Sequence, residues 1–534
     1  MMRVRRKDSP KPGGAVFHVL ALILVFIVLA GMRLAYPDLS HGDDHADSNM
    51  MIAGANFDRL GFTTLKFMCV QNPRAIDASE AYTHFPPAPE ILNGLMRKFF
   101  SFDQLWQFRL VSLLVSLGGL LIFWWFAMEL SGGSEWFATV AAALLLTHPI
   151  YLSLFDSLHQ TPYTELFRAI TCLLALKLAT LEGSDSSRSR LLAGLWLCAF
   201  FNILFTFESV VFLWLFTVLV LLVLGPPRLK DAMPAILLVS SAPVVGFALR
   251  FALNAWYYGG ISQAFGHFLD IAAIRAVGVG DVAGTQVTLA TWWQNVFIAF
   301  VEEGFRLSFL ALLVLALLMF VVVSLRGDAS GRRILIVVAL LAIAGVTWSF
   351  VMPAHSLAHS GLTFLKRHLL FAYAVFWAAA ARSLFLCLPS CLPQRFVPLS
   401  LSVVAAVFVL MAAVGVFQSE LPVTAAKQAR ELAFRQLAEK LVALQQTFSP
   451  SAVVATNYFR QPFISYYTNR QVLMVRTPEM LSLLASPPSY FLLVPFGDEP
   501  TKQLTASLET AGYRPQFVIE SQLLPFVVWK PGTP

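Results

Sequence analysis

The sequence predicts a polytopic membrane protein that is all-α in its membrane part and ends in a small α/β domain. The 534-residue chain is 57% hydrophobic and only 13% charged, and its mean hydropathy is +0.69. A soluble protein carries roughly a quarter charged residues. Beyond Gln418 the hydropathy falls and stays low. The sequence therefore predicts two domains, a membrane domain over 1–418 and a water-facing domain over 419–534.

Apolar windows give the number of membrane spans, since each spanning helix needs about 20 mostly apolar residues. The apolar run at 191–224 is too long for one helix and contains Asn202 and Glu208, so we divide it into two spans. The sequence then predicts about eleven transmembrane helices. The other windows are 15–36, 108–130, 136–155, 160–181, 233–253, 305–325, 333–353, 364–387 and 396–418.

Basic residues in the short loops predict the orientation. The formal net charge is +7, and the basic N-terminus "MMRVRRKDSPKPGG" falls on the same side as "EGSDSSRSR", "GPPRLKD", "RGDASGRR" and "CLPSCLPQR". Cytoplasmic loops carry this excess of Lys and Arg. The N-terminus is thus expected inside, and the segments 37–107 and 254–304 and the C-terminal domain outside. No basic patch interleaved with aromatic residues occurs, so we expect no nucleic-acid partner.

The outer segment and the tail have their own local patterns. "SNMMIAGANFDRLGF" and "PEILNGLMRKFF" are amphipathic and are expected to lie along the membrane surface. "YTHFPPAPE" between them is expected to be extended, because proline fixes φ. In the tail, "SAVVAT", "QVLMV", "YFLLVPF" and "FVIE…PFVVW" are strand-like and alternate with helical pieces, which indicates an α/β domain.

The stretch "LSHGDDHADSNMM" directly follows the first span and holds the first candidate site. Asp43 or Asp44 could act as a general base on a hydroxyl at the outer membrane edge. A structural alternative is a polar loop in which Asp47 caps the next helix. A third alternative is a divalent cation held by His41, Asp43 and His45. No cofactor is firmly predicted, and the divalent cation stays an open alternative.

The second candidate site is "HSLAHSGLTFLKRHLLFAY". His359 lies in an outer loop, and Lys366, Arg367 and His368 open the next span. Basic residues at this depth are costly unless they meet an anion, and a phosphate is a natural partner. The alternative is snorkelling to lipid headgroups. Arg59 in the first outer segment has the same two interpretations.

Two further charges, Glu165 and Arg168, stand one turn apart inside an expected span and could neutralise each other.

Taken in order, these features resemble glycosyltransferases of the GT-C fold, specifically the bacterial family 39 group. That group includes protein O-mannosyltransferases and the aminoarabinose transferase of lipid A. The resemblance covers nearly the whole chain. It is carried by "GDDHADS", "YTHFPPAPEILNGLMRKFF", "FRLVSLLVSLGGLLIFWWFAMELSGG", "THPIYLSLFDSLHQTPYTELF", "FLKRHLLFAYAVFWAAAARSL" and "FISYYTNRQVL".

The resemblance implies roles for single residues. Asp43 matches the catalytic carboxylate, and Asp44 stands where many relatives have glutamate. Tyr82 and His84 would lie near the donor or acceptor. Lys366 and Arg367 match the basic pair that holds the lipid phosphate. Many relatives have a transmembrane aspartate near the fourth span, where this chain offers only a glutamate.

The resemblance also implies an activity and a location. The donor would be a polyprenyl-phosphate sugar, the acceptor a lipid, glycan or protein outside the cytoplasm, and the transfer would invert the anomeric centre. The location would be the bacterial inner membrane, among membrane lipids. The main alternative is a transporter or flippase for a lipid-linked or anionic solute. Such proteins usually contain internal repeats, and the sequence shows none.

Overall fold

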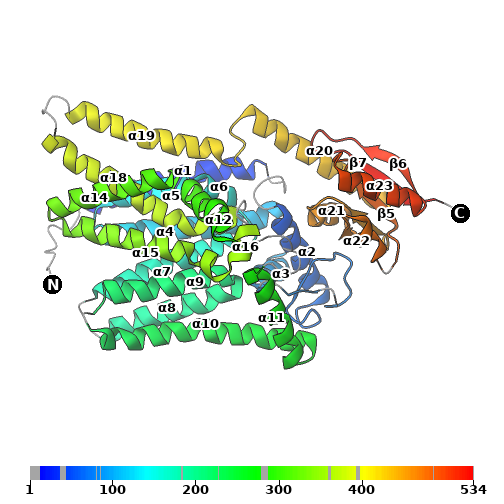
Figure 1. Cartoon of the computed structure of the whole chain (residues 1–534), viewed down its shortest axis with the longest axis horizontal. Coiled ribbons are helices and arrows are strands. Elements are labelled where there is room, and N and C mark those ends of the chain that lie inside the picture. Colours follow the sequence, from blue (N-terminus) through cyan, green and yellow to red (C-terminus); the bar gives the residue numbers. More distant parts are fainter. Residues whose placement is uncertain are drawn as a thin grey trace.

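A bundle of long helices lies beside a smaller region that contains a sheet in this computed structural model, as Figure 1 shows. The predicted fold class, a helical membrane protein with a small C-terminal α/β region, is confirmed. The structure describes residues 12–36, 44–79, 81–83, 86–181, 185–226, 228–277, 287–358, 363–391, 397–484 and 486–532.

Every expected span contains apolar helix. The division of 191–224 is confirmed: α8 ends at Phe205, and the Thr206 side chain caps α9 by accepting from the Glu208 backbone N–H. The expected span 136–155 is broken, because His148 caps a second helix that has Pro149 at its first position. The helices are α1 Pro12–Leu34, α4 Leu105–Leu130, α5 Glu135–Leu146, α6 Pro149–Leu154, α7 Thr161–Thr180, α8 Asp185–Phe205, α9 Phe207–Val223, α10 Leu229–Tyr258, α14 Phe309–Leu325, α15 Ala329–Val351, α18 Leu370–Cys391 and α19 Val397–Gln418.

By length and composition alone, fewer helices qualify as membrane spans than the eleven that the sequence predicts. In the described part of the chain, 6 helices are long and apolar enough to cross a membrane. The number is 7 if Leu289–Phe305 and Phe309–Leu325, which meet at a bend of 55°, form one broken span. Among the rest, α5 and α9 are short, and α7 contains Glu165 and Arg168. The count of eleven stays a prediction.

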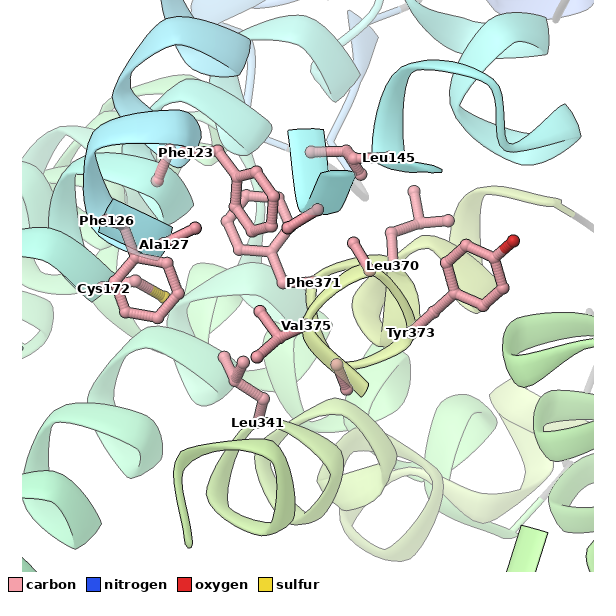
Figure 2. Packing of buried hydrophobic residues seen from close by; sticks show 14 of the residues in the cluster. Phe123, Phe126, Ala127, Leu145, Cys172, Leu341, Leu370, Phe371, Tyr373 and Val375 are labelled. Carbon is pink, nitrogen blue, oxygen red and sulfur yellow. The ribbon is translucent and has the colours of Figure 1, made fainter. Parts of the chain in front are cut away.

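Helix α18 lies at the centre of the bundle. Figure 2 shows its residues Phe371 and Val375 surrounded by side chains from other helices, including Phe123 of α4, Cys172 of α7 and Leu341 of α15. The ring centroids of Phe123 and Phe371 are 4.5 Å apart. Close packing of this kind fixes the position of α18, and with it the basic residues at its N-terminus.

The first outer segment folds into two packed helices and a two-stranded ribbon. Most of α2 is buried, because α3 covers one side and α21 of the C-terminal region covers another. The expectation that this helix lies along the membrane surface was therefore wrong: its apolar face meets protein instead. The elements are α2 Asp44–Leu60, β1 Cys69–Val70, β2 Ala81–Tyr82 and α3 Ala88–Phe100.

Shorter helices connect the later spans. They are α11 Ile261–Val277, α12 Leu289–Trp292, the π-helix η1 Trp293–Ile298, α13 Ala299–Phe305, α16 Pro353–Ala358, α17 Thr363–Lys366 and the 3-10 helix η2 Arg367–Leu369. Figure 1 shows α2, α3, α11 and α16 at the end of the bundle that faces the C-terminal region.

The C-terminal region is a five-stranded mixed sheet between helices, in the order β4-β3-β5-β7-β6. Side chains alternate between two cores: Val454 and Leu492 pack under α20 and α21, whereas Ala455 and Phe491 pack under α22 and α23. This is the period of two that a strand imposes. The elements are α20 Ala425–Thr447, β3 Val453–Thr456, α21 Gln461–Thr468, β4 Gln471–Met474, α22 Pro478–Ser482, β5 Tyr490–Leu493, α23 Glu499–Thr510, β6 Tyr513–Ile519 and β7 Phe526–Pro531.

A buried carboxyl group lies where α3 meets the ribbon. Glu90 of α3 is 4% exposed, and burial raises its pKa to about 7, although a hydrogen bond with Cys69 and the charge of Arg250 act in the opposite direction. The ordinary pKa of a glutamate side chain, which applies in the unfolded chain, is 4.5. At a pH between these two pKa values, Glu90 keeps its proton in the folded protein and has lost it in the unfolded chain.

We therefore expect the free energy of unfolding to fall as the pH rises from about 4.5 to 7, because the folded state binds more protons there. The loss should total about 3 kcal/mol. Glu90→Gln should remove most of this slope. Thermal unfolding in detergent across this pH range measures it, with the exposed Glu499→Gln as the control. An unchanged slope in Glu90→Gln would contradict the expectation.

Candidate active site

The acidic end of the candidate site is the start of α2. Asp44 lies in the first turn, where a carboxylate interacts favourably with the helix dipole. It is 3% exposed, and its Oδ2 lies 2.5 Å from Nη1 of Arg460, which belongs to the C-terminal region. Asp43, the expected base, and His41 lie outside the described residues.

Asp47 does not cap α2, so that expectation was wrong: the helix begins at Asp44, and Asp47 lies within it. Its Oδ1 accepts hydrogen bonds from the Ser157 hydroxyl, at 3.0 Å, and from the Leu158 backbone N–H, at 2.8 Å. Because both donors lie in the segment between α6 and α7, Asp47 attaches the acidic end of the site to the start of α7.

A chain of buried charges continues from Asp47 into the bundle. Its Oδ2 lies 3.6 Å from Nη2 of Arg109 on α4, and Arg109 Nη1 lies 3.6 Å from Asp156 Oδ2. Asp156 Oδ1 lies 3.2 Å from Nε of Arg33 on α1. All four side chains are almost fully buried. Sequence reasoning missed this network, although two arginines inside apolar windows were a usable indication, because such charges need partners.

The basic end of the site is the turn η2 and the residue before it. Lys366 forms an ion pair with the half-exposed Glu303 of α13. Arg367 is fully buried, and its Nη1 donates to the Thr161 hydroxyl at 2.8 Å. Its guanidinium also lies 3.9 Å from carboxylate oxygens of Glu165 and Glu208.

The expected pair of Glu165 and Arg168 is confirmed, and it extends further than expected. Arg168 Nη1 lies 2.7 Å from both carboxylate oxygens and 3.2 Å from the Arg367 carbonyl oxygen. Its Nη2 lies 2.6 Å from Nδ1 of His368. Arg275 of α11 lies within electrostatic range of Glu208. Helices α7, α9 and α11 thus all contribute charged groups around η2.

A glycine allows η2 to lie this deep in the bundle. A Cβ atom at Gly345 of α15 would lie only 2.7 Å from the His368 carbonyl oxygen and from a methyl carbon of Leu369. Any larger residue would push η2 away from α15. Gly345 therefore helps to fix the position of Arg367 against the two carboxylates.

A small cavity, with room for about one water molecule, lies beside this cluster, between α4, α6, α7 and the start of α18. Arg367 and Glu165 give it a charged side, and the rest of its wall is mostly apolar. The cavity is lined by Ser116, Ile150, Tyr151, Leu154, Phe155, Thr161, Pro162, Glu165, Arg367 and Leu370.

The other predicted binding residues that the structure describes do not line this cavity. Tyr82 lies in the ribbon, on β2, within electrostatic range of Arg275. Arg59 donates to the Ala75 carbonyl oxygen at 2.6 Å and to Asn56 Oδ1 at 2.8 Å, so it holds the loop that follows α2. Its substrate-binding role stays a prediction. His84 and His359 lie outside the described residues.

No group of three His, Cys, Asp or Glu side chains that could hold a metal ion occurs among the residues that the structure describes. Of the expected ligand trio, only His45 belongs to them.

The comparisons with known proteins concern the fold. No family model matches the sequence, and no curated protein matches it. The structure is similar to ArnT from Cupriavidus metallidurans in the apo state, with a TM-score of 0.57 and 14% identity over 96% of this chain and 98% of that one. It is also similar to the Archaeoglobus fulgidus oligosaccharyltransferase tethered with an acceptor peptide, with a TM-score of 0.50 and 12% identity over 97% and 74%. The chain has the GT-C fold that both share.

The buried charge network should matter for stability. Asp156→Asn would leave Arg33 and Arg109 buried with less opposing charge, which costs about 3–5 kcal/mol. A thermal or denaturant unfolding series in detergent measures the loss. Glu499→Gln, which breaks the exposed pair with Lys502, is the matched control and should cost at most about 1 kcal/mol. Equal effects of the two changes would show that the network contributes little.

Proposed function

We propose that the chain is an integral membrane glycosyltransferase. It moves a sugar from a polyprenyl-phosphate sugar to an acceptor outside the cytoplasm. The observation that carries this proposal is the fully buried Arg367, beside a small cavity, inside a bundle with the GT-C fold. The fold is shared with an oligosaccharyltransferase that was crystallised with an acceptor peptide, which supports the same class of reaction here.

The charges around the cavity favour an anionic ligand. Three arginines, Arg168, Arg275 and Arg367, surround two carboxylates, Glu165 and Glu208. Arginine can hold a phosphate through two parallel hydrogen bonds, so a phosphate beside Arg367 would be stabilised here.

In the proposed reaction, Asp43 accepts the proton of the acceptor hydroxyl. The hydroxyl oxygen then attacks the anomeric carbon from the face opposite the phosphate. The bond between that carbon and the phosphate oxygen breaks, and polyprenyl phosphate leaves with the bonding electrons. The anomeric centre is inverted. Arg367, supported by Lys366, stabilises the charge that develops on the phosphate.

The proposed location is the bacterial inner membrane, with the N-terminus in the cytoplasm and the C-terminal region outside. The polyprenyl chain would reach the cavity from the lipid. The acceptor, a lipid, glycan or protein, would approach from the end of the bundle that carries α2 and the C-terminal region.

The assay is transfer of radiolabelled sugar from a synthetic polyprenyl-phosphate sugar to an acceptor fraction of the cell envelope, with purified protein in liposomes. Transfer that depends on the protein supports the proposal. Movement of the intact labelled lipid between leaflets, without transfer, would support a flippase instead.

Asp43→Asn should lower kcat about 100-fold or more, because a general base is lost while the side-chain shape is nearly kept. The unfolding temperature should stay close to that of the wild type. Steady-state transfer assays measure the effect, with Asp103→Asn, an exposed aspartate before α4, as the control. Near-normal turnover in Asp43→Asn, with loss in Asp44→Asn, would move the base to Asp44.

Arg367→Ala should weaken binding of a polyprenyl-phosphate analogue and also slow transfer. The combined loss should be about 2.7–4 kcal/mol in kcat/KM, the size typical of a charge-stabilising group. Arg382→Ala is the control, because Arg382 lies on α18, which directly follows η2, and pairs with Asp328 instead. Isothermal titration and initial rates measure the two effects. Wild-type affinity in a folded Arg367→Ala protein would remove the phosphate from this cluster.

A further inference from the structure

The C-terminal region contacts the acidic end of the site through one charged side chain. Arg460 stands between β3 and α21, and its partner Asp44 lies 416 residues earlier in the sequence. The atoms Nη1 and Oδ2 are 2.5 Å apart, and the two side chains are 27% and 5% exposed. A nearly buried carboxylate thus has a cation from a different part of the chain beside it.

The ion pair is not what docks the C-terminal region. Helix α21 packs on α2 through Tyr466, which joins a buried apolar cluster with Met50, Met51, Phe108 and Leu158. A separate hydrogen bond runs from Arg74 Nε to the Asn469 carbonyl oxygen at 3.1 Å. These contacts do not involve Arg460, so the region can stay docked without it.

We propose that Arg460 is a positioning residue for the proposed transfer reaction, and that the C-terminal region completes the reaction centre by supplying it. The inference rests on the proposed function, in which Asp43 and Asp44 form the acidic pair. A guanidinium bound to Asp44 fixes the direction of that carboxylate at the first turn of α2. The first turn of α2, which directly follows the proposed base in the sequence, is then held from both the bundle and the C-terminal region.

The surroundings of Arg460 fit a place where an acceptor arrives. Its guanidinium lies 5.2 Å from the ring centre of Phe459, and that ring is 49% exposed. A partly exposed cation and an exposed aromatic ring therefore lie together next to Asp44. A hydroxyl-bearing acceptor that reaches the acid from the C-terminal region would meet them first.

The test is a set of variants in the sugar-transfer assay. Arg460→Ala should lower kcat about 10- to 100-fold, since a small misplacement of reacting groups has effects of this size. KM for the donor should stay within about twofold, because the phosphate end of the site is unchanged. Arg460→Lys should recover part of the rate, and added guanidinium ion should partly restore Arg460→Ala. Arg430→Ala, which removes an exposed arginine from the same region, should behave as the wild type.

Two further measurements separate positioning from docking. Limited proteolysis of the C-terminal region should be unchanged in Arg460→Ala, and increased in Tyr466→Ala. Labelling of Asp44 by a carbodiimide and an amine at fixed pH, read by mass spectrometry, should rise several-fold in Arg460→Ala and not in Arg430→Ala.

Wild-type kcat in Arg460→Ala would overturn the inference, as would a loss of rate that accompanies undocking and does not respond to lysine or guanidinium. If the wild-type protein transfers no sugar, the proposed function fails by itself. Unchanged Asp44 labelling would then overturn the inference, and increased labelling would support the assignment of Arg460 to Asp44.

Discussion

Charges buried in an apolar bundle must meet opposite charges, and in this protein that constraint connects the two ends of the site. The segment from Asp156 to Arg168 carries both sets of partners. Before α7 begins, Asp156, Ser157 and Leu158 hold Arg33, Arg109 and Asp47. Within α7, Thr161, Glu165 and Arg168 hold Arg367 and His368. One short rigid segment therefore sets the distance between the acidic end and the basic end.

The same constraint explains why α2 is not a surface helix. Its first turn contains Asp44 and Asp47, and each needs a cation once the helix is covered. Arg460 arrives from the C-terminal region and Arg109 from α4. The apolar face of α2 then packs between α3 and α21. In the folded protein, burial of the helix is therefore accompanied by pairing of its acids.

Hydropathy was sufficient to predict the long apolar helices, the break before Glu208 and the strands of the C-terminal region. These features depend on local composition and period, which a sequence displays directly. Hydropathy did not predict the break at His148 or the helices within 254–304. The partners of Arg33, Arg109 and Lys366 could not be predicted in this way. Each pair joins segments far apart in the chain, and pairing depends on which helices become neighbours. The capping role of Asp47 failed for the same reason: its true partners, Ser157 and Leu158, are more than a hundred residues away.

In the proposed reaction, a lipid-linked donor and a water-borne acceptor come from different phases, and the arrangement of charges fits that division. The arginine cluster is surrounded by apolar helices, where a phosphate is strongly attracted because little water screens it. Asp44 lies instead at the end of the bundle where α2 meets the C-terminal region. In the proposed reaction, a sugar bound by its phosphate beside Arg367 extends towards that end. Asp43 then takes the proton of an acceptor that does not enter the bundle.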